Sequence, residues 1–337
     1  MEIRELLARL VTGHDLSQDE ARWMMERIMS GEMTPAQIGA YLTALRMKGE
    51  TVEEIAGSAL TMRAKATRVA ATGTVIDTCG TGGDGLGTFN ISTTVAFVVA
   101  ACGVTVAKHG NRAISSKSGS ADLLMALGVK IDLEPFDVER CLAEAGIGFL
   151  FAPRHHGAMR HAMGPRQELG FRTLFNLLGP LTNPAGAPNQ LLGVFDARWV
   201  EPVARALGRL GSRHAMVVHG FDGLDEITTT GPTHVAEWTP DGRLEHHVLH
   251  PESFGIAMAA PEALVGGDAV QNAAITRGVL SGERGPRRDI VLLNAGAALR
   301  VAGLVPDIAS GMALAGDAVD SGRARDRLDR LVTLSNS

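Results

Sequence analysis

The chain has 337 residues, of which 45% are hydrophobic and 4% aromatic, and its formal net charge is −5 at pH 7. This length and apolar content suit two domains with a substantial core, whereas the acidic balance disfavours nucleic acid as a partner. The three cysteines are too few and too scattered for a disulfide framework or a zinc site, which favours a reducing, cytoplasmic location. The longest apolar stretch, residues 93–107, is too short to cross a membrane.

The first seventy residues predict a small bundle of helices. Apolar residues recur at i, i+3, i+4 and i+7 in three runs, within residues 3–10, 21–28 and 38–45. Ser17 with Glu20 and Thr51 with Glu54 have the spacing of capping boxes, which mark helix starts. The charged N-terminal stretch lacks the apolar segment of a signal peptide.

From residue 74 onward, short strand-like runs alternate with helical ones. The candidate strands are "TVIDTC", "VTVAK", "IGFLFA", "QLLGVF" and "HAMVVHG". This alternation predicts a sheet with parallel strands and covering helices, whose ligands gather beyond the carboxyl ends of the strands. The stretch from Met163 to Asn183 is again helical and is expected to leave the sheet and join the N-terminal helices.

The glycine-rich stretch "DTCGTGGDGLGTFNIST", residues 77–93, predicts an anion site. Gly80, Gly82 and Gly85 satisfy the dinucleotide pattern G-x-G-x-x-G, but the following helix comes late, and Lys108 stands where that fold requires an acid. The P-loop pattern fails as well, because no Gly-Lys-Ser/Thr follows. We therefore expect a phosphate cradle of another kind, with a tight turn before an ordinary capped helix as the alternative.

Hydroxyl and amide side chains at the start of the next helix strengthen this interpretation. Asn90, Ser92 and Thr93 lie where free N–H groups and the helix dipole favour phosphate. Asp84 would repel a bare phosphate, so its presence favours a metal ion or a sugar hydroxyl nearby.

Two further clusters follow other predicted strands. Residues 108–120, "KHGNRAISSKSGS", crowd together cations, amides and hydroxyls, which suits a phosphate ester; a solvated basic loop is the alternative. In "GFDGLDEITTTGPT", Asp225 and Glu226 form an adjacent acidic pair. Alone they fit a solvated turn, but beside two phosphate cradles they predict magnesium ligands.

Together these clusters resemble the anthranilate phosphoribosyltransferase family, as do residues 149–184, "FLFAPRHHGAMRHAMGPRQELGFRTLFNLLGPLTNP". The resemblance implies an α/β fold: a small helical domain plus a large α/β domain with a mixed, mostly parallel central sheet flanked by helices. The expected domains are residues 1–70, joined by a returning segment at about 163–187, and residues 71–337. It also implies a homodimer joined through the helical domain.

The resemblance further implies transfer of phosphoribosyl from 5-phosphoribosyl 1-diphosphate to anthranilate, with Mg2+ as cofactor. The implied donor-binding residues are Gly80, Gly83, Asp84, Thr88, Asn90, Ser92, Thr93, Lys108, Asn111, Arg112, Ala113, Ser115, Ser116 and Ser120. The implied anthranilate-binding residues are Gly80, His109, Asn111, His156 and Arg166. The implied metal ligands are Ser92, Asp225 and Glu226.

His109 is the candidate acceptor of the amine proton, with a packing role as the alternative. Gly157 departs from the family, which often has proline there, and is expected to loosen the loop through which the acceptor passes. Two rival functions stay open. A pyrimidine nucleoside phosphorylase would need neither the acidic pair nor magnesium, and a nucleic-acid-binding offshoot of the family would need a basic face.

Overall fold

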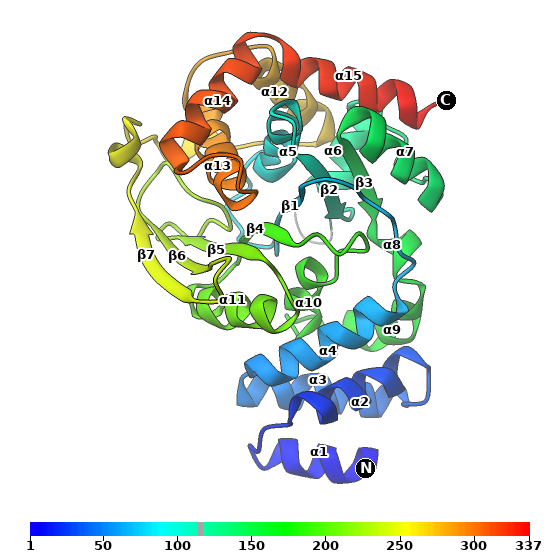
Figure 1. Ribbon diagram of the computed structural model, residues 1–337. Coiled ribbons are helices and arrows are strands. Elements are labelled where there is room, and N and C mark those ends of the chain that lie inside the picture. Colours follow the sequence, from blue (N-terminus) through cyan, green and yellow to red (C-terminus); the bar gives the residue numbers. More distant parts are fainter. Residues whose placement is uncertain (114–116) are drawn as a thin grey trace.

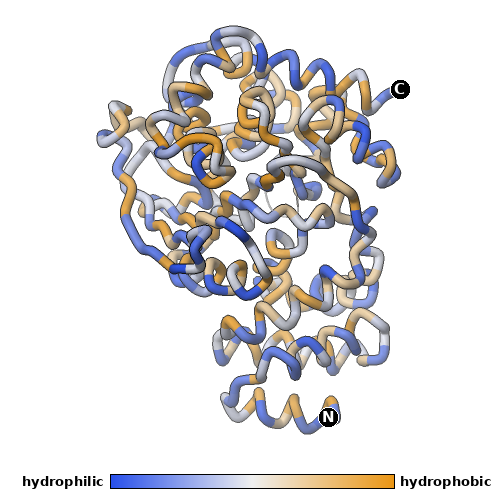
Figure 2. Tube along the Cα trace, in the orientation of Figure 1, coloured by the Kyte–Doolittle hydropathy of each residue, from blue (hydrophilic) through white to orange (hydrophobic). Residues whose placement is uncertain are grey.

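The N-terminal helices begin at the capping residues that the sequence marks. The computed structural model describes residues 1–113 and 117–337. The helices are α1 (Ile3–Val11), α2 (Gln18–Met29), α3 (Pro35–Lys48) and α4 (Val52–Lys65). Capping boxes at Ser17, Thr34 and Thr51 start α2, α3 and α4. Hydrophilic and hydrophobic residues alternate along α1, α2 and α3, and each of these helices buries one side in a common core (Figure 2). Helix α4 is buried on most sides because other helices pack around it.

A seven-stranded sheet forms the centre of the larger part of the molecule (Figure 1). Its order is β3-β2-β1-β4-β5-β6-β7. The strands are β1 (Val75–Gly80), β2 (Thr105–Gly110), β3 (Ile147–Phe151), β4 (Asn189–Gly193), β5 (His214–Gly220), β6 (Thr233–Trp238) and β7 (Leu244–Leu249). The first five pair in parallel, as predicted, while β6 and β7 are antiparallel additions that the sequence did not reveal.

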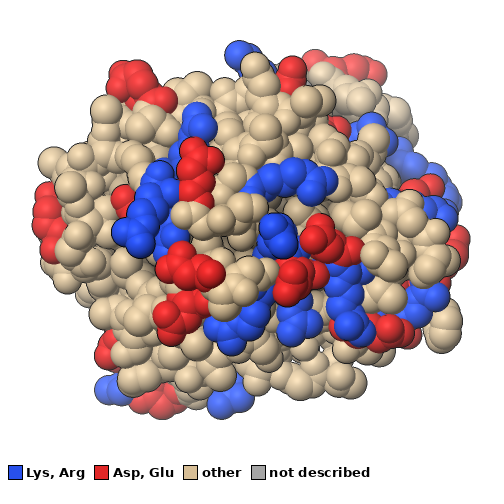
Figure 3. Space-filling view, turned by 90° about the horizontal axis from the view of Figure 1, so that it is seen from above, with Lys and Arg blue, Asp and Glu red and all other residues tan. Residues whose placement is uncertain are grey.

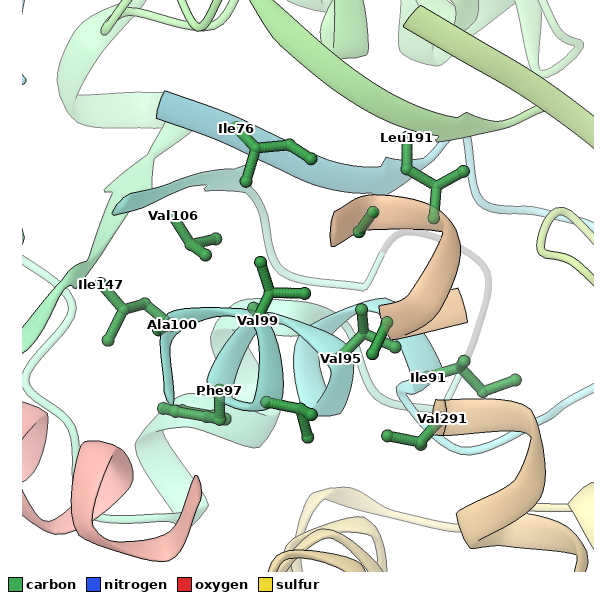
Figure 4. Close-up of a cluster of buried hydrophobic side chains, with 14 of the residues drawn as sticks. Ile76, Ile91, Val95, Phe97, Val99, Ala100, Val106, Ile147, Leu191 and Val291 are labelled. Atoms are coloured by element: carbon green, nitrogen blue, oxygen red, sulfur yellow. The ribbon is translucent and has the colours of Figure 1, made fainter. Parts of the chain in front are cut away.

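Seven helices lie on one side of the sheet, some against the strands and others packed on those helices (Figure 1). They are α5 (Ile91–Ala101), α6 (Ser120–Ala126), α7 (Pro135–Ala145), α12 (Ala269–Leu280), α13 (Pro286–Val301), α14 (Ile308–Asp320) and α15 (Arg323–Ser335). Beyond the polar residues of its first turn, helix α5 is apolar on all sides because it lies between the strands, which contribute Ile76 and Val106, and α13, which contributes Val291 (Figure 4). The long apolar stretch 93–107 is divided at Gly103, which lies between α5 and β2 and has a φ of 92°.

The other face packs on helices that continue into the N-terminal bundle. These are α8 (Ala152–His155), α9 (Arg160–Leu169), α10 (Phe175–Leu181) and α11 (Val200–Arg209). Helix α9 packs against α2 and α3, and α10 and α11 pack against α4, so a segment between β3 and β4 does return to the N-terminal helices. One apolar cluster therefore runs from Leu6 in α1 to Val217 in β5.

Arg63 of α4 fastens this junction. Its guanidinium donates to the carbonyl oxygens of Leu181 (2.6 Å) and Leu210 (3.0 Å), at the C-terminal ends of α10 and α11. Helix C-termini carry unpaired carbonyls and partial negative charge, so a cation suits both ends.

Short 3-10 turns at 157–159, 197–199, 251–254 and 261–264 complete the chain. No helix in the described part of the chain has the length and apolarity needed to cross a membrane.

Candidate active site

Three loops meet at one edge of the sheet. Residues 81–90 follow β1, the described residues 111–113 and 117–119 follow β2, and residues 221–232 connect β5 to β6. Because β6 runs antiparallel to β5, this last loop stays at the edge where the parallel strands end. Asn90 Nδ2 donates to the carbonyl of Ser118 (3.1 Å), and the Gly82 N–H donates to Asp225 Oδ2 (2.6 Å). The first of the three clusters singled out in the sequence therefore contacts both of the others.

Glycines at two strand ends make room for the acidic loop. A Cβ on Gly80 would lie 2.3 Å from Asp225 Oδ2, and one on Gly193 would lie 1.6 Å from the Asp225 carbonyl oxygen. Both distances are too short for any side chain. Sequence reasoning missed Gly193, although a glycine inside the apolar run "QLLGVF" signals a close backbone approach. The glycine loop itself uses the left-handed region at Gly82, Gly83, Gly85 and Gly87.

The acidic pair is buried and directed at the glycine loop and the start of α5. Glu226 Oε1 accepts the N–H of Ser92 (3.0 Å), and Asp225 and Glu226 are each 8% exposed. Burial, together with the charges of Asp84 and Glu226, raises the pKa of Asp225 well above its usual value. Burial also raises the pKa of Glu226 to about 7, against the opposing effect of Lys108.

This gathering of carboxylates fits a divalent cation. The charge of Asp84 makes ionisation of both Asp225 and Glu226 more costly, and a bound cation would relieve that cost. The described residues contain no group of three or more His, Cys, Asp or Glu side chains that could hold a metal ion by itself. Magnesium is bound through one or two carboxylates plus substrate phosphates, so an incomplete protein shell is what such a site needs.

Lys108 places a buried positive charge between the first two loops. Its Nζ donates to the Thr78 carbonyl (2.6 Å) and to Ser92 Oγ (3.4 Å), and the residue is 2% exposed. Burial lowers the pKa of Lys108, while the carboxylates of Asp77 and Glu226 oppose that shift. A buried cation with few partners is poised to bind an anion.

Asp77 is a buried acid beside these residues to which sequence reasoning assigned no role. It accepts hydrogen bonds from the His109 N–H (3.3 Å) and from Asn183 Nδ2 (2.7 Å). Burial raises its pKa to about 6, against the effect of Lys108 and these hydrogen bonds. Asp77 thus ties β1 to β2 and to the end of the returning segment. Its signal was available, because a charged residue stands inside the otherwise apolar predicted strand.

His109 and His156 form a pair beside these residues. Their ring centroids are 5.1 Å apart, and both Nε2 atoms are buried without a hydrogen-bond partner among the described residues. Burial lowers the pKa of His109 well below its usual value and that of His156 to about 4, so both rings are neutral at pH 7. At Gly157, next in the chain, a Cβ would meet open space.

The glycine loop is covered by a later segment that no sequence motif indicated. Thr88 forms an isolated bridge with Val265, and Asn272 Nδ2 donates to Asn90 Oδ1 (2.9 Å). Thr93 lies in the first turn of α5 and is 1% exposed. The later segment therefore anchors the end of the glycine loop that enters α5.

The described residues on either side of the gap after β2 are joined by hydrogen bonds to the start of α6. Asp122 Oδ2 accepts the N–H of Ala113 (2.9 Å), and Ser120 Oγ donates to the Asn111 carbonyl (3.3 Å). Arg112 is exposed at the surface. The predicted donor contacts Ser115 and Ser116 lie outside the described residues.

The returning segment carries two arginines, of which Arg172 contacts the glycine loop. Arg166 lies 5.9 Å from the Phe175 ring and makes no hydrogen bond or ion pair with another described residue, so its N–H groups are free for an anionic ligand. Burial lowers its pKa. Arg172, to which the sequence assigned no role, donates to the Gly83 carbonyl and stacks 4.1 Å from the centre of the Phe195 ring.

The fold and this strand-end site define a glycosyl transferase with an accessory helical bundle. Residues 72–325 match the model described as glycosyl transferase family, a/b domain, and residues 4–66 match the model described as its helical bundle domain. Curated relatives include the anthranilate phosphoribosyltransferase of Thioalkalivibrio sulfidiphilus, 56% identical over 100% of both chains, and that of Paramagnetospirillum magneticum, 57% identical over 99% of this chain and 96% of the other.

Solved structures agree with these relatives. The anthranilate phosphoribosyltransferase of Thermus thermophilus superposes with a TM-score of 0.93 at 46% identity, covering 98% of this chain and 99% of the other. The Saccharomyces cerevisiae enzyme in complex with PRPP and Mg superposes with a TM-score of 0.90 at 27% identity, covering 99% and 98%. The chain belongs to the anthranilate phosphoribosyltransferase family, which confirms the predicted resemblance and the predicted fold class.

Proposed function

We propose that this chain transfers the phosphoribosyl group of 5-phosphoribosyl 1-diphosphate to the amine of anthranilate, giving N-(5-phosphoribosyl)anthranilate and diphosphate in tryptophan biosynthesis. The observation that carries the proposal is the convergence of a glycine loop, buried Lys108 and the pair Asp225 and Glu226 at one sheet edge. Yeast relatives with PRPP and Mg, and with 4-fluoroanthranilate, support the two substrates.

The donor would lie along the glycine loop and the first turn of α5. Left-handed glycines expose backbone N–H groups to an anion, and the α5 N-terminus favours phosphate. Lys108 adds a fixed cation, and its hydrogen bond to Ser92 keeps it at that helix start. The remaining predicted contacts, from Asn111 to Ser120, would bind from the second loop.

Asp225 and Glu226, with Ser92, would hold Mg2+ against the diphosphate. When bound, the metal neutralises the negative charge that gathers on the leaving diphosphate. The N–H groups of Gly82 and Ser92 orient the two carboxylates before any ligand arrives. Asp84 lies close enough to raise the pKa of Asp225 and so adds to the negative potential.

Arg166 would bind the anthranilate carboxylate and direct the amine toward the ribose C1. A guanidinium can donate two parallel N–H bonds to a carboxylate, which fixes orientation as well as position. His109 would receive the amine proton late in the reaction. Its lowered pKa makes it a weak base, and the amine becomes acidic enough to give up a proton to it only once the new C–N bond has formed. Gly80, Asn111 and His156 would complete the acceptor site.

Neither rival function is favoured by a particular observation. A nucleoside phosphorylase has no use for the buried acidic pair. A nucleic-acid binder requires a basic surface, whereas on the face shown in Figure 3 basic and acidic side chains interleave.

A homodimer joined through the helical bundle is part of the proposal. Large apolar side chains stand exposed on two outer helices: Val11 of α1 is 69% exposed and Met47 of α3 is 84% exposed. Met47→Glu is expected to shift the wild-type dimer toward monomer in light scattering at micromolar concentration. A monomeric wild-type protein at that concentration would contradict the proposal.

The decisive experiment follows anthranilate fluorescence with donor and magnesium present. Asp225→Asn and Glu226→Gln are each expected to lower kcat/KM by about 10²–10³-fold, the usual cost of losing one charge-stabilising group. Asp241 is an exposed acid on the β6–β7 hairpin, so Asp241→Asn is the matched control and should leave kcat/KM unchanged. Wild-type protein that leaves anthranilate unconsumed would refute the proposed reaction.

A further inference from the structure

Arg172 reaches the middle of the glycine loop from the opposite side of the site. Its guanidinium donates through Nη2 to the carbonyl oxygen of Gly83, which lies 89 residues earlier in the chain. A Cβ on Gly83 would lie 3.1 Å from the same Nη2 atom, so the arginine lies directly against the loop backbone. Gly83 has a φ of 77°, a conformation that glycine adopts without strain.

This contact anchors a stretch of loop that has little else to hold it. The Gly82 N–H is bound by Asp225, and the Gly87 carbonyl is bound by the Gly266 N–H (2.9 Å). Between those points, the hydrogen bond from Arg172 is the one that joins the backbone of residues 83–86 to another element of the described structure. The Leu86 N–H only turns back onto Asp84, within the loop. Four left-handed glycines give this backbone many alternatives.

The hydrogen bond fixes the orientation of a whole peptide unit. No cis peptide bond occurs among the described residues, and in a trans peptide the carbonyl of one residue and the N–H of the next point in opposite directions. Because Arg172 binds the Gly83 carbonyl, the N–H of Asp84 is directed away from Arg172. A carbonyl oxygen repels an anion, whereas an N–H attracts one, so this orientation decides whether the peptide favours or opposes phosphate.

Arg172 is itself held in place. Its guanidinium stacks on the Phe195 ring at 4.1 Å, and the Phe195 N–H donates to Thr81 Oγ1 (3.0 Å) at the start of the same loop. The Thr81 N–H in turn donates to the Gly193 carbonyl (2.9 Å) at the end of β4. The arginine therefore connects the loop to the rigid sheet, and it does so from the segment that also carries Arg166.

We propose that Arg172 is a positioning residue that holds the glycine loop in the conformation that binds the phosphoribosyl donor. The inference rests on the proposed function, since it takes the glycine loop to be the donor site. Arg172 acts through the Gly83 peptide rather than on the substrate itself. Its loss should therefore weaken the donor and leave anthranilate affinity largely unchanged.

Two variants separate the hydrogen bond from the packing. Arg172→Met keeps a flexible apolar chain over Phe195 but removes every donor, whereas Arg172→Lys keeps a cationic donor that can reach a carbonyl. Arg198→Met is the matched control, because Arg198 also stacks on an aromatic ring (Trp199, 4.9 Å) but lies on the surface in the 3-10 turn 197–199. Donor binding is measured by titration calorimetry with magnesium, which needs no turnover.

We expect Arg172→Met to raise the donor Kd by about tenfold or more, the range for losing a hydrogen bond from a charged group. Arg172→Lys should stay within about threefold of wild type, Arg198→Met should match wild type, and the KM for anthranilate should change less than about twofold in all three. A donor Kd in Arg172→Met equal to that of wild type or of Arg172→Lys overturns the role of Arg172. A wild type that binds donor but consumes no anthranilate overturns the proposed reaction alone.

Discussion

Replacing Glu237 by glutamine is expected to destabilise the fold far from the site, in a manner that depends on pH. Glu237 lies in β6 and is 1% exposed. Its Oε1 accepts from His214 Nε2 of β5 and from Arg300 Nη1 of α13, both at 2.7 Å. Its Oε2 has no hydrogen-bond partner among the described residues, and His247 Nε2 of β7 lies 3.8 Å away. One carboxylate thus joins three strands to a covering helix.

The magnitude follows from the pKa of this group. Burial alone would raise the pKa of Glu237, but the hydrogen bonds from His214 and Arg300 outweigh it and lower the pKa from 4.5 to about 2. At about 1.4 kcal/mol per pKa unit, the ionised carboxylate contributes about 3 kcal/mol of stability. Because the pKa is lowered in the folded protein, this contribution is complete above pH 4.5 and is lost as the pH falls toward 2.

Urea unfolding of wild type and Glu237→Gln, between pH 7 and pH 3, tests this reasoning. The free energies of unfolding should differ by about 3 kcal/mol at pH 7, and the gap should narrow steadily below pH 4.5. Glu245→Gln, an exposed neighbour in β7, should change stability by less than about 0.5 kcal/mol. A gap below about 1 kcal/mol at pH 7, or a gap that is the same at pH 3, would refute the assignment.

Three further changes probe the site. Gly193→Ala puts a Cβ 1.6 Å from a backbone oxygen of the acidic loop, so thermal unfolding should show that the free energy of unfolding falls by at least about 2 kcal/mol, and donor binding should weaken. Gly231→Ala, with open space around it, is the control, and equal effects of the two changes would contradict the steric argument. Arg166→Ala should raise the KM for anthranilate by about tenfold or more with little change for the donor, as steady-state kinetics would reveal; parallel rises would argue against its role. His109→Ala should lower kcat by a larger factor than it changes the KM of either substrate. An unchanged kcat would exclude His109 as the proton acceptor.

The parts of the fold that the sequence predicted are those with a strong local pattern. The five parallel strands are largely buried, and apart from a few polar residues such as Asp77 and Lys108 they read as apolar runs. Strand β7, "LEHHVL", is the last strand of the sheet and has no buried residue, so its polar sequence resembled a loop. Strand β6 carries Glu237 at a buried position, and only the partners of that carboxylate explain why a charge is tolerated there.

In the candidate site, too, short local patterns indicate some features and contacts between distant residues determine others. Glycines, hydroxyls and adjacent acids in three short stretches of sequence are enough to indicate a phosphate and metal site. The contacts that shape it join distant residues: Arg172 with Gly83, Gly193 with Asp225, and Thr88 with Val265. No local periodicity records such partnerships, because they depend on how the chain returns to the sheet.

The apolar cluster shared by the bundle and the sheet has a consequence for synthesis on the ribosome. Helices α1–α4 end at Lys65, but their core also needs α10, which ends at Leu181. At translation rates of about 5–20 residues per second, the apolar surfaces of these helices stay exposed for on the order of ten seconds before α10 is synthesised. We therefore expect chaperones to bind the nascent N-terminal helices until α10 has been synthesised. A truncated chain ending near residue 70 would keep its apolar surface exposed and would be prone to aggregation.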